Sequence, residues 1–367
     1  MNIGIDATVV AQSHIVGISR FITQLVLNLA RVDSTNEYYL CYRARALKRP
    51  HLIWRPHHPR FHVRFFQGAL NRRLFRKLDV FHATYQRLPV HEGLVPYICT
   101  VHDIFFLSCP DRVSAKAHER WGARYRDVAA RSRLITTVSE FSKGEIVRLL
   151  GVEPQRVQVV PNAVSPNYAP QEPNVVARLR ERYGFTQPYI LFGGGSDARK
   201  NVLGALRAFA MALPRLPSDP CLAISGAAGP LEDAARTLVR EAGLSTRVRF
   251  LGFVPDADYP GLMSGSLLYF FPSLFEGFGL PVLEAMACGA PVLTSSTTSL
   301  PEVCGDAAVL VDPADAAQMA DALVELAGNE TLRQALRQRG LRRARQSTWR
   351  QVAERTLELY SQVAAGR

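Results

Sequence analysis

The stretch from Phe271 to Gly289 reads F-P-S-L-F-E-G-F-G-L-P-V-L-E-A-M-A-C-G, and a glycine-rich turn within it runs directly into a helix. Pro281 suits the first position of that helix, where its missing N–H would have had no partner, so the turn presents backbone amides. The helix dipole favours an anion at the same place. Glu276 and Glu284 flank the turn, and each carboxylate can accept hydrogen bonds from hydroxyl groups. A place for phosphate beside places for hydroxyls indicates a nucleotide sugar.

Two glutamates with seven residues between them, around E-G-F-G-L-P, resemble the signature of the retaining glycosyltransferase family 4. The resemblance implies the GT-B fold, an α/β architecture of two facing Rossmann-like domains with parallel sheets. It implies that Glu276 holds hydroxyls of the donor sugar and that Glu284 binds the nucleotide ribose. It also implies that the sugar and phosphate contact the turn formed by Gly277, Phe278, Gly279 and Leu280. The alternative is an ordinary junction between a loop and a helix, with two solvated glutamates.

The chain has 367 residues, 47% of them hydrophobic, which is enough for two domains of ordinary size, each with its own core. We expect an N-terminal Rossmann-like domain at residues 1–165 that binds the acceptor. A C-terminal Rossmann-like domain that binds the nucleotide sugar is expected at residues 174–346. The resemblance implies that a terminal helix, within residues 347–367, packs back on the first domain.

Short apolar runs alternate with helical patterns, which is typical of parallel sheets covered by helices on both faces. The expected strands of the first domain lie at 3–5, 38–42, 63–66, 80–83, 97–101, 134–138 and 157–160. Those of the second lie at 189–192, 221–224, 248–251, 267–271, 292–294 and 308–311. The clearest helical patterns cover 18–30, 71–78, 115–130, 140–150 and 348–364. Because such sheets bind ligands outside the carboxyl ends of their strands, we expect one deep cleft between the two domains.

The sequence contains no pattern of a secretory leader, and its apolar runs are far shorter than the roughly 20 residues needed to span a bilayer. Six cysteines are scattered without the two-residue spacing of a zinc or redox pair, which is typical of reduced thiols. The expected location is therefore the cytoplasm, with the inner face of the cytoplasmic membrane as a second option.

The net charge of +12 arises in the first half of the chain, because residues 1–167 hold 24 Lys and Arg against 12 Asp and Glu while the remainder holds 20 against 20. A basic domain predicts an anionic partner, which can be membrane phospholipid, a diphosphate-linked acceptor or nucleic acid. Within it, an amphipathic segment either lies on an anionic bilayer or packs on its own sheet with a solvated basic face. The apolar stripe of this segment consists of Phe66, Leu70, Leu74 and Leu78. The basic residues beside the stripe are Arg72, Arg73, Arg76 and Lys77.

A second glycine-rich turn, F-G-G-G-S-D-A-R-K-N, follows the first strand of the second domain. Arg199 and Lys200 stand there at the start of a helix, where the dipole makes cations mildly costly unless an anion is bound. We expect both to neutralise the diphosphate that leaves during glycosyl transfer. The family often has an arginine five residues before the lysine, whereas position 195 of this chain is glycine.

The first domain contributes T-V-H-D at the end of a strand, which places His102 and Asp103 at the edge where ligands bind. By resemblance, His102 contacts the donor sugar or phosphate near the reacting carbon, and Asp103 orients neighbouring groups or the acceptor. Gly17 begins a helix in I-V-G-I-S-R-F, where the amides face either phosphate or acceptor, or form a plain helix start. By resemblance again, the backbone near Phe253 and Val254 holds the nucleobase.

Retention at the anomeric carbon proceeds either through a carboxylate nucleophile or by front-side attack, with the leaving phosphate taking the acceptor proton. The sequence favours front-side attack, because Glu276 is already assigned to sugar hydroxyls and no other carboxylate is an obvious nucleophile. The Asp-x-Asp sequence of the chain, Asp256–Asp258, lies outside the two glycine-rich turns that are assigned to the donor. We therefore expect an enzyme that needs neither a metal nor a cofactor.

These features predict a retaining hexosyltransferase that acts on a glycan, including one carried on a lipid diphosphate. The T-V-H-D and A-R-K-N variants resemble bacterial mannosyltransferases of polysaccharide and O-antigen assembly in lipopolysaccharide, which favours α-mannosyl transfer from GDP-mannose. UDP-glucose and other nucleotide hexoses stay open as donors. A basic nucleic-acid-binding protein would explain the charge, but the sequence has no nucleic-acid-binding signature, and we expect no such partner.

Overall fold

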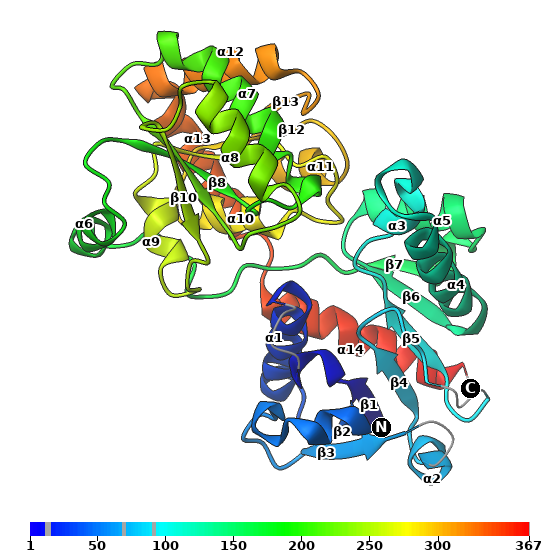
Figure 1. The fold of residues 1–367 in the computed structure, drawn as a ribbon. Helices are drawn as coiled ribbons and strands as arrows, with labels where there is room; N and C mark the ends of the chain where they lie inside the picture. The colour runs from blue at the N-terminus through cyan, green and yellow to red at the C-terminus, as the bar shows by residue number, and fades with distance from the viewer. Residues whose placement is uncertain (12–15, 68–70, 90–92, 367) are drawn as a thin grey trace. The chain divides into compact units, whose positions relative to one another are not determined.

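The computed structural model describes residues 1–11, 16–67, 71–89 and 93–366 of the chain (Figure 1). The chain divides into two units, each built around its own parallel sheet. The N-terminal unit consists of residues 1–163 and 348–367, and the C-terminal unit consists of residues 164–347.

The sheet of the N-terminal unit has seven strands in the order β3-β2-β1-β4-β5-β6-β7. Every neighbouring pair is parallel, and the register between β1 and β2 places Ile3 opposite Tyr38 and Ile5 opposite Leu40. The strands are β1 (Asn2–Asp6), β2 (Glu37–Arg43), β3 (Phe61–Phe66), β4 (Val80–Ala83), β5 (Tyr97–Thr100), β6 (Leu134–Thr137) and β7 (Val157–Val159). Each coincides with one of the apolar runs expected to form a strand.

Side chains of this sheet alternate between two cores, because successive residues of a strand point to opposite faces. Val80 packs into the core under the terminal helices, and Phe81 packs into the core on the other face. The first face is covered by α1 (Val16–Val32) and α14 (Trp349–Ala365). The second is covered by α2 (Arg72–Arg76), α4 (Ala115–Arg131) and α5 (Glu140–Leu150), and the short α3 (Phe105–Ser108) precedes α4.

Helix α14 lies beside α1, and it belongs to the N-terminal unit although it ends the chain (Figure 1). A capping box starts it, in which Thr348 accepts a hydrogen bond from the backbone of Gln351 and the Gln351 side chain accepts one from the backbone of Thr348. Its buried face includes Tyr360, whose hydroxyl lies 2.7 Å from Nδ1 of His82 on β4. Burial lowers the pKa of His82 to about 3, so the ring is neutral at pH 7.

The sheet of the C-terminal unit has six strands in the order β10-β9-β8-β11-β12-β13, and all neighbouring pairs are parallel. Its strands are β8 (Tyr189–Gly193), β9 (Cys221–Ser225), β10 (Val248–Gly252), β11 (Leu268–Phe271), β12 (Val292–Ser295) and β13 (Val309–Val311). The helices are α6 (Pro173–Arg182), α7 (Val202–Ala212), α8 (Glu232–Glu241), α9 (Tyr259–Ser264), α10 (Leu280–Ala287), α11 (Leu300–Cys304), α12 (Ala316–Gly328) and α13 (Glu330–Ala344). Helices α7, α8 and α12 share one core with the central strands. The expected α/β class with two Rossmann-like parallel sheets is confirmed.

Candidate active site

The glycine-rich turn between β11 and α10 is held in place by the hydroxyl group of Ser299. Ser299 Oγ donates to the carbonyls of Glu276, at 3.0 Å, and Phe278, at 2.8 Å. Gly279 has φ of 102°, and a Cβ there would come within 2.6 Å of Leu300, so a larger residue does not fit. Pro281 lies in the first turn of α10, as expected. The turn that we expected to contact sugar and phosphate is therefore a fixed structure at the carboxyl end of β11.

Lys200 and Glu276 come from two separate sequence motifs and meet in the C-terminal unit. The Lys200 ammonium lies 2.5 Å from Oε1 of Glu276, and Ser273 Oγ donates to the same oxygen at 2.6 Å. Their side chains are 16% and 13% exposed. The ammonium also lies 5.0 Å from the centre of the Phe271 ring. The cation expected to bind a diphosphate and the carboxylate expected to bind sugar hydroxyls are thus neighbours, and both side chains are partly exposed.

Arg199 has a different partner from Lys200, because its guanidinium forms an ion pair with Asp197 at 3.0 Å. Burial raises the pKa of Asp197, but hydrogen bonds and charge from Arg199 outweigh burial and lower it overall. The carbonyl of Arg199 accepts hydrogen bonds from Leu274 N, at 2.7 Å, and from Ser273 Oγ, at 3.0 Å. The backbone of Arg199 therefore supports the loop that carries Glu276, which sequence reasoning did not foresee.

A steric contact explains why position 195 is glycine. Its φ is +58°, and an added Cβ would lie 2.4 Å from the carbonyl oxygen of Ala227. The backbone at position 195 therefore disfavours the arginine that the family resemblance associates with it.

Glu284 lies in α10 and is 5% exposed. Burial raises the pKa of Tyr269 well above its usual value, and the charges of Glu284 and Glu276 both contribute to the increase. The two glutamates of the motif therefore lie near one buried tyrosine, whose hydroxyl occupies the space beside Gly193 that a Cβ would need.

Phe253 and Val254 directly follow β10, and they differ sharply in exposure. The Phe253 side chain is 74% exposed, whereas Val254 is 2% exposed. The turn next to them is joined to the end of β9, since Gly226 N donates to the carbonyl of Gly252 at 2.9 Å. The predicted donor-binding residues therefore follow β8, β10 and β11, and they lie at the carboxyl edge of one sheet.

His102 and Asp103 follow β5 at the carboxyl edge of the other sheet. His102 Nε2 lies 3.1 Å from the carbonyl of Thr84 and must donate to it, because a carbonyl can only accept. Burial lowers the pKa of His102 to about 4 despite this hydrogen bond. The neutral ring therefore keeps Nδ1 as an acceptor. Asp103 accepts a hydrogen bond from Phe105 N at 3.2 Å, which caps the turn that follows.

Gly17 is the second residue of α1, and the residues just before this helix lie outside the described part of the chain. Among the described residues, no atom lies within 4 Å of where a Cβ at Gly17 would stand, so their packing does not require glycine there. Whether its amide contacts phosphate or acceptor stays a prediction.

Sequence reasoning missed a group of charged residues at the carboxyl edge of the first sheet. Asp6 ends β1 and is 6% exposed, and burial raises its pKa although Arg43 lies 3.6 Å away and lowers it. Arg43 ends β2, and its guanidinium donates to the carbonyl of Arg87 at 2.8 Å. An acid at the end of the first strand was the available signal, but only the strand order β2-β1-β4 brings these residues together.

The amphipathic segment around α2 packs inward. Phe66 and Leu78 are 3% and 0% exposed and Leu74 is partly buried against the same core, so these residues of the apolar stripe belong to the core rather than to a bilayer contact. Leu70 lies outside the described residues. The basic side chains of α2 are exposed, and within the described residues no helix is long and apolar enough to cross a membrane.

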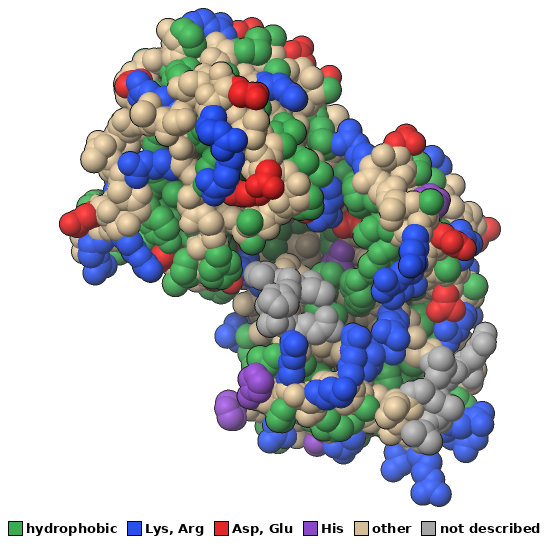
Figure 2. All heavy atoms as spheres, viewed as in Figure 1, with side chains coloured by type: hydrophobic (Ala, Val, Ile, Leu, Met, Phe, Trp, Pro, Cys, Tyr) green, Lys and Arg blue, Asp and Glu red, His purple; other side chains and the backbone are tan. Residues whose placement is uncertain are grey.

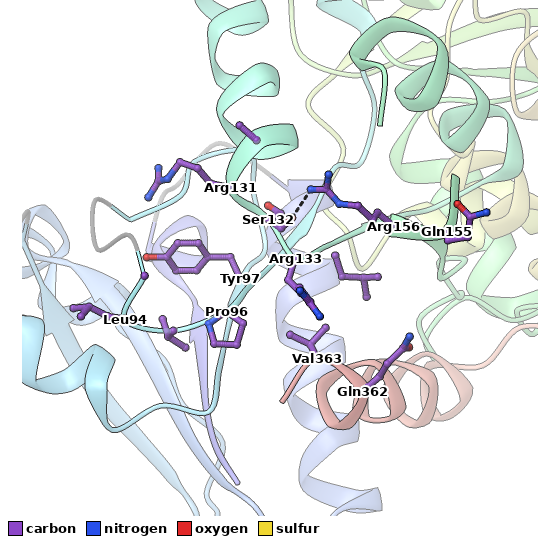
Figure 3. Close-up of a pocket in the computed structure, with 14 residues that line it drawn as sticks. Leu94, Pro96, Tyr97, Arg131, Ser132, Arg133, Gln155, Arg156, Gln362 and Val363 are labelled. Atoms are coloured by element: carbon purple, nitrogen blue, oxygen red, sulfur yellow. Dashed lines mark hydrogen bonds between the residues drawn. The ribbon is translucent and has the colours of Figure 1, made fainter. Parts of the chain in front are cut away.

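A large pocket of about 800 Å³ lies at the opposite edge of the first sheet (Figure 3). It is lined by Tyr97, Arg131, Arg133 and Arg156, near the starts of β5, β6 and β7. Arg156 donates to the carbonyl of Ser132 at 2.6 Å. Since the pocket lies at the amino ends of the strands, it is separate from His102 and Asp103.

Two family models match consecutive parts of the chain. The one described as Glycosyltransferase Family 4 matches residues 15–168, and the one described as Glycosyl transferases group 1 matches residues 177–343. O-antigen chain mannosyltransferase B of Escherichia coli is 34% identical over 269 residues, which cover 72% of this chain and 69% of that protein. The chain belongs to glycosyltransferase family 4. The expected family is confirmed, and the alternative of a basic nucleic-acid-binding protein is set aside.

This glycosyltransferase has further relatives. The serotype-specific mannosyltransferase WbdA of Escherichia coli is 27% identical over 274 residues, which cover 72% of this chain but 33% of that protein. The crystal structure of HepE from Anabaena in complex with UDP and glucose matches with a TM-score of 0.75 at 19% identity, and the match covers 98% of this chain and 99% of that one. At that identity the likeness shows the fold, which is GT-B.

Proposed function

We propose that this glycosyltransferase transfers mannose from GDP-mannose, with retention of configuration, to a glycan or lipid-diphosphate-linked glycan in the synthesis of a cell-surface polysaccharide. The ion pair between Lys200 and Glu276 carries the catalytic part of the proposal. The choice of mannose is supported by the 34% identity to an O-antigen chain mannosyltransferase. The C-terminal unit binds the donor, and the N-terminal unit binds the acceptor.

The pair of Lys200 and Glu276 suits a donor that brings both negative charge and hydroxyl groups. When the donor binds, the Lys200 ammonium contacts a diphosphate oxygen, and Glu276 accepts hydrogen bonds from sugar hydroxyls. Negative charge grows on the diphosphate as its bond to the anomeric carbon breaks, so a fixed cation stabilises the transition state more than the bound donor. The acceptor hydroxyl forms its bond on the same face of the sugar, and its proton passes to the departing phosphate oxygen.

His102 contributes as a neutral hydrogen-bond acceptor. Its Nε2 is committed to Thr84, so Nδ1 is the atom that accepts a hydrogen bond from a sugar hydroxyl. Lys200 and the backbone amides of the donor site supply the charge stabilisation in this mechanism, and we propose that no metal is needed. We propose that contact with an anionic membrane depends on exposed basic side chains such as those of α2.

A donor panel tests the function. Purified enzyme is incubated with GDP-mannose, UDP-glucose and other nucleotide hexoses, with EDTA present, and donor hydrolysis is measured. We expect turnover to be fastest with GDP-mannose. A preference for UDP-glucose would move the assignment to a glucosyltransferase, and activity lost to EDTA and restored by a divalent cation would contradict metal independence.

A further inference from the structure

The N-terminal unit gathers arginines at the edge of the sheet that carries His102. We call these residues the arginine cluster: Arg43, Arg45, Arg87, Arg120 and Arg124. They come from the ends of β2 and β4 and from α4, which are far apart in sequence. Figure 2 shows that lysine and arginine side chains are frequent on the displayed face of this unit.

The members of the arginine cluster lie close enough to repel one another. Burial is the first cause that lowers the pKa of Arg43; Asp6 raises it, and Arg87, Arg45 and Arg124 lower it again. Burial also lowers the pKa of Arg124, and three members of the cluster lower it further. Charges of one sign held together cost free energy, which an anion bound among them would offset. Asp6 supplies one carboxylate, but it is buried beneath the cluster beside Arg43.

Two hollows give an anion access to the arginine cluster. One, of about 440 Å³, is lined by Arg43, Arg45, Lys48 and Arg87 together with Phe66 and Gln67. The other, of about 260 Å³, is lined by Arg45, Lys48 and Arg49 on the side of Thr8. The larger one falls within the range of roughly 300–1,000 Å³ that is typical of small-ligand sites. The lining of both hollows is basic, and the described residues that line them include no acidic side chain.

Aromatic rings adjoin the arginine cluster on the side of α4. The Arg124 guanidinium lies 4.6 Å from the centre of the Trp121 ring, and Tyr85 meets the same ring edge-on at 5.8 Å. The Phe106 ring stacks on the Trp121 ring, with 4.8 Å between the ring centres. Trp121 and Tyr85 are both partly exposed. Because Arg124 and Phe106 already lie against the Trp121 ring, the partly exposed Tyr85 ring and the edge of Trp121 are the surface that remains for a sugar ring.

We propose that the arginine cluster binds a phosphate or diphosphate group on the acceptor, with Tyr85 and Trp121 beside the sugar that this group carries. The inference rests on the proposed function, in which the N-terminal unit binds the acceptor, and it names the acceptor class as a phosphate-bearing glycan. Guanidinium groups suit this role because they bind phosphate oxygens through paired, charge-assisted hydrogen bonds.

The test compares two probes that differ only in charge: mannobiosyl alkyl diphosphate and the matched neutral mannobiosyl alkyl glycoside. Their dissociation constants are measured by calorimetry with GDP at saturating concentration, so that a diphosphate cannot occupy the donor site. The variant is Arg45→Ser with Arg87→Ser, since both side chains are exposed. Its matched control, Arg72→Ser with Arg73→Ser, removes the same charge from exposed residues of α2 on the same unit.

We expect the wild-type enzyme to bind the diphosphate probe more tightly than the glycoside. The cluster variant should raise the dissociation constant of the diphosphate probe about tenfold or more, leave that of the glycoside unchanged, and differ from the α2 control. No preference in the wild-type enzyme, or equal losses in variant and control, would overturn the proposal. Because these are binding measurements, they stand apart from the donor panel, whose failure would overturn the mannosyltransferase assignment alone.

A lipid headgroup offers the same phosphate chemistry, so a second arm uses vesicles with and without anionic phospholipid. The proposal expects flotation of the cluster variant on anionic vesicles to match that of the wild-type enzyme. If flotation is lost only in the cluster variant, while its affinity for the diphosphate probe is unchanged, the cluster is a membrane site and the proposal is wrong.

Discussion

Lys200 and Arg199 are adjacent cations, yet their surroundings give them different tasks. Lys200 pairs with Glu276, where we propose that it binds the diphosphate, whereas Arg199 pairs with Asp197 and supports the glutamate loop through its carbonyl. We expect Lys200→Ala to lower kcat/KM for GDP-mannose by about 100-fold or more, a loss typical of removing a group that stabilises transition-state charge. Arg199→Ala should lower it less than about tenfold, because its backbone remains. Steady-state kinetics on both variants, with thermal melts to confirm folding, checks the difference, and equal losses would contradict it.

Gly195 is a residue whose identity is set by backbone geometry. Gly195→Ala should lower the free energy of unfolding by about 1–3 kcal/mol, because it combines a positive φ with a contact to Ala227 that is too close. Gly144→Ala is the control, since Gly144 lies in α5 with open space around its Cα and should gain up to about 1 kcal/mol. Urea denaturation measures both, and a Gly195→Ala variant as stable as the wild type would contradict the steric account.

The buried His82 and the partly buried His102 predict how stability depends on pH. Burial lowers the pKa of His82 to about 3 and that of His102 to about 4, whereas an unfolded histidine titrates near 6.5. Below about pH 6.5 these histidines bind protons in the unfolded chain but stay neutral in the folded chain. The free energy of unfolding should therefore fall as the pH drops from 7 to 5. His82→Gln should show a shallower fall. Urea titrations at several pH values test this, and identical slopes would contradict it.

Among the elements, α14 is joined to the sheet by one buried polar contact. The Tyr360 hydroxyl bonds His82, whose Nε2 lies 2.7 Å from Thr100 Oγ1. Tyr360→Phe leaves a buried ring nitrogen without its partner and should cost about 1–3 kcal/mol. Tyr39→Phe is the control, since the Tyr39 hydroxyl has no hydrogen-bond partner among the described residues. If both substitutions shift the urea midpoint equally, the contact is not what holds the helix.

The elements themselves were largely predictable from the sequence. Each predicted strand overlaps an observed one, because buried parallel strands are short apolar runs between turn residues. The segment around α2 was harder: a helix was expected over 71–78, and α2 covers only Arg72–Arg76. Its apolar stripe allowed two interpretations, and only the packing of Phe75 and Leu78 in the core decides between them.

At the scale of the whole molecule, contacts between segments that are distant in the chain could not be predicted from the sequence. The motifs that contain Lys200 and Glu276 were both recognised, but their pairing depends on β8 lying next to β11 in the sheet. The arginine cluster depends on the order β2-β1-β4, and the charge count showed only that the first half of the chain is basic. Local pattern identifies residues of a site, whereas strand order decides which of them meet.

The central claim is that the C-terminal unit holds the donor's diphosphate against Lys200. A crystal structure of the enzyme soaked with GDP tests it most directly. We predict density for the diphosphate within hydrogen-bonding distance of the Lys200 ammonium, with the ribose at Glu284 and the base beside residues 253–254. Nucleotide density elsewhere in the molecule, with the surroundings of Lys200 and Glu276 unoccupied, would contradict the account.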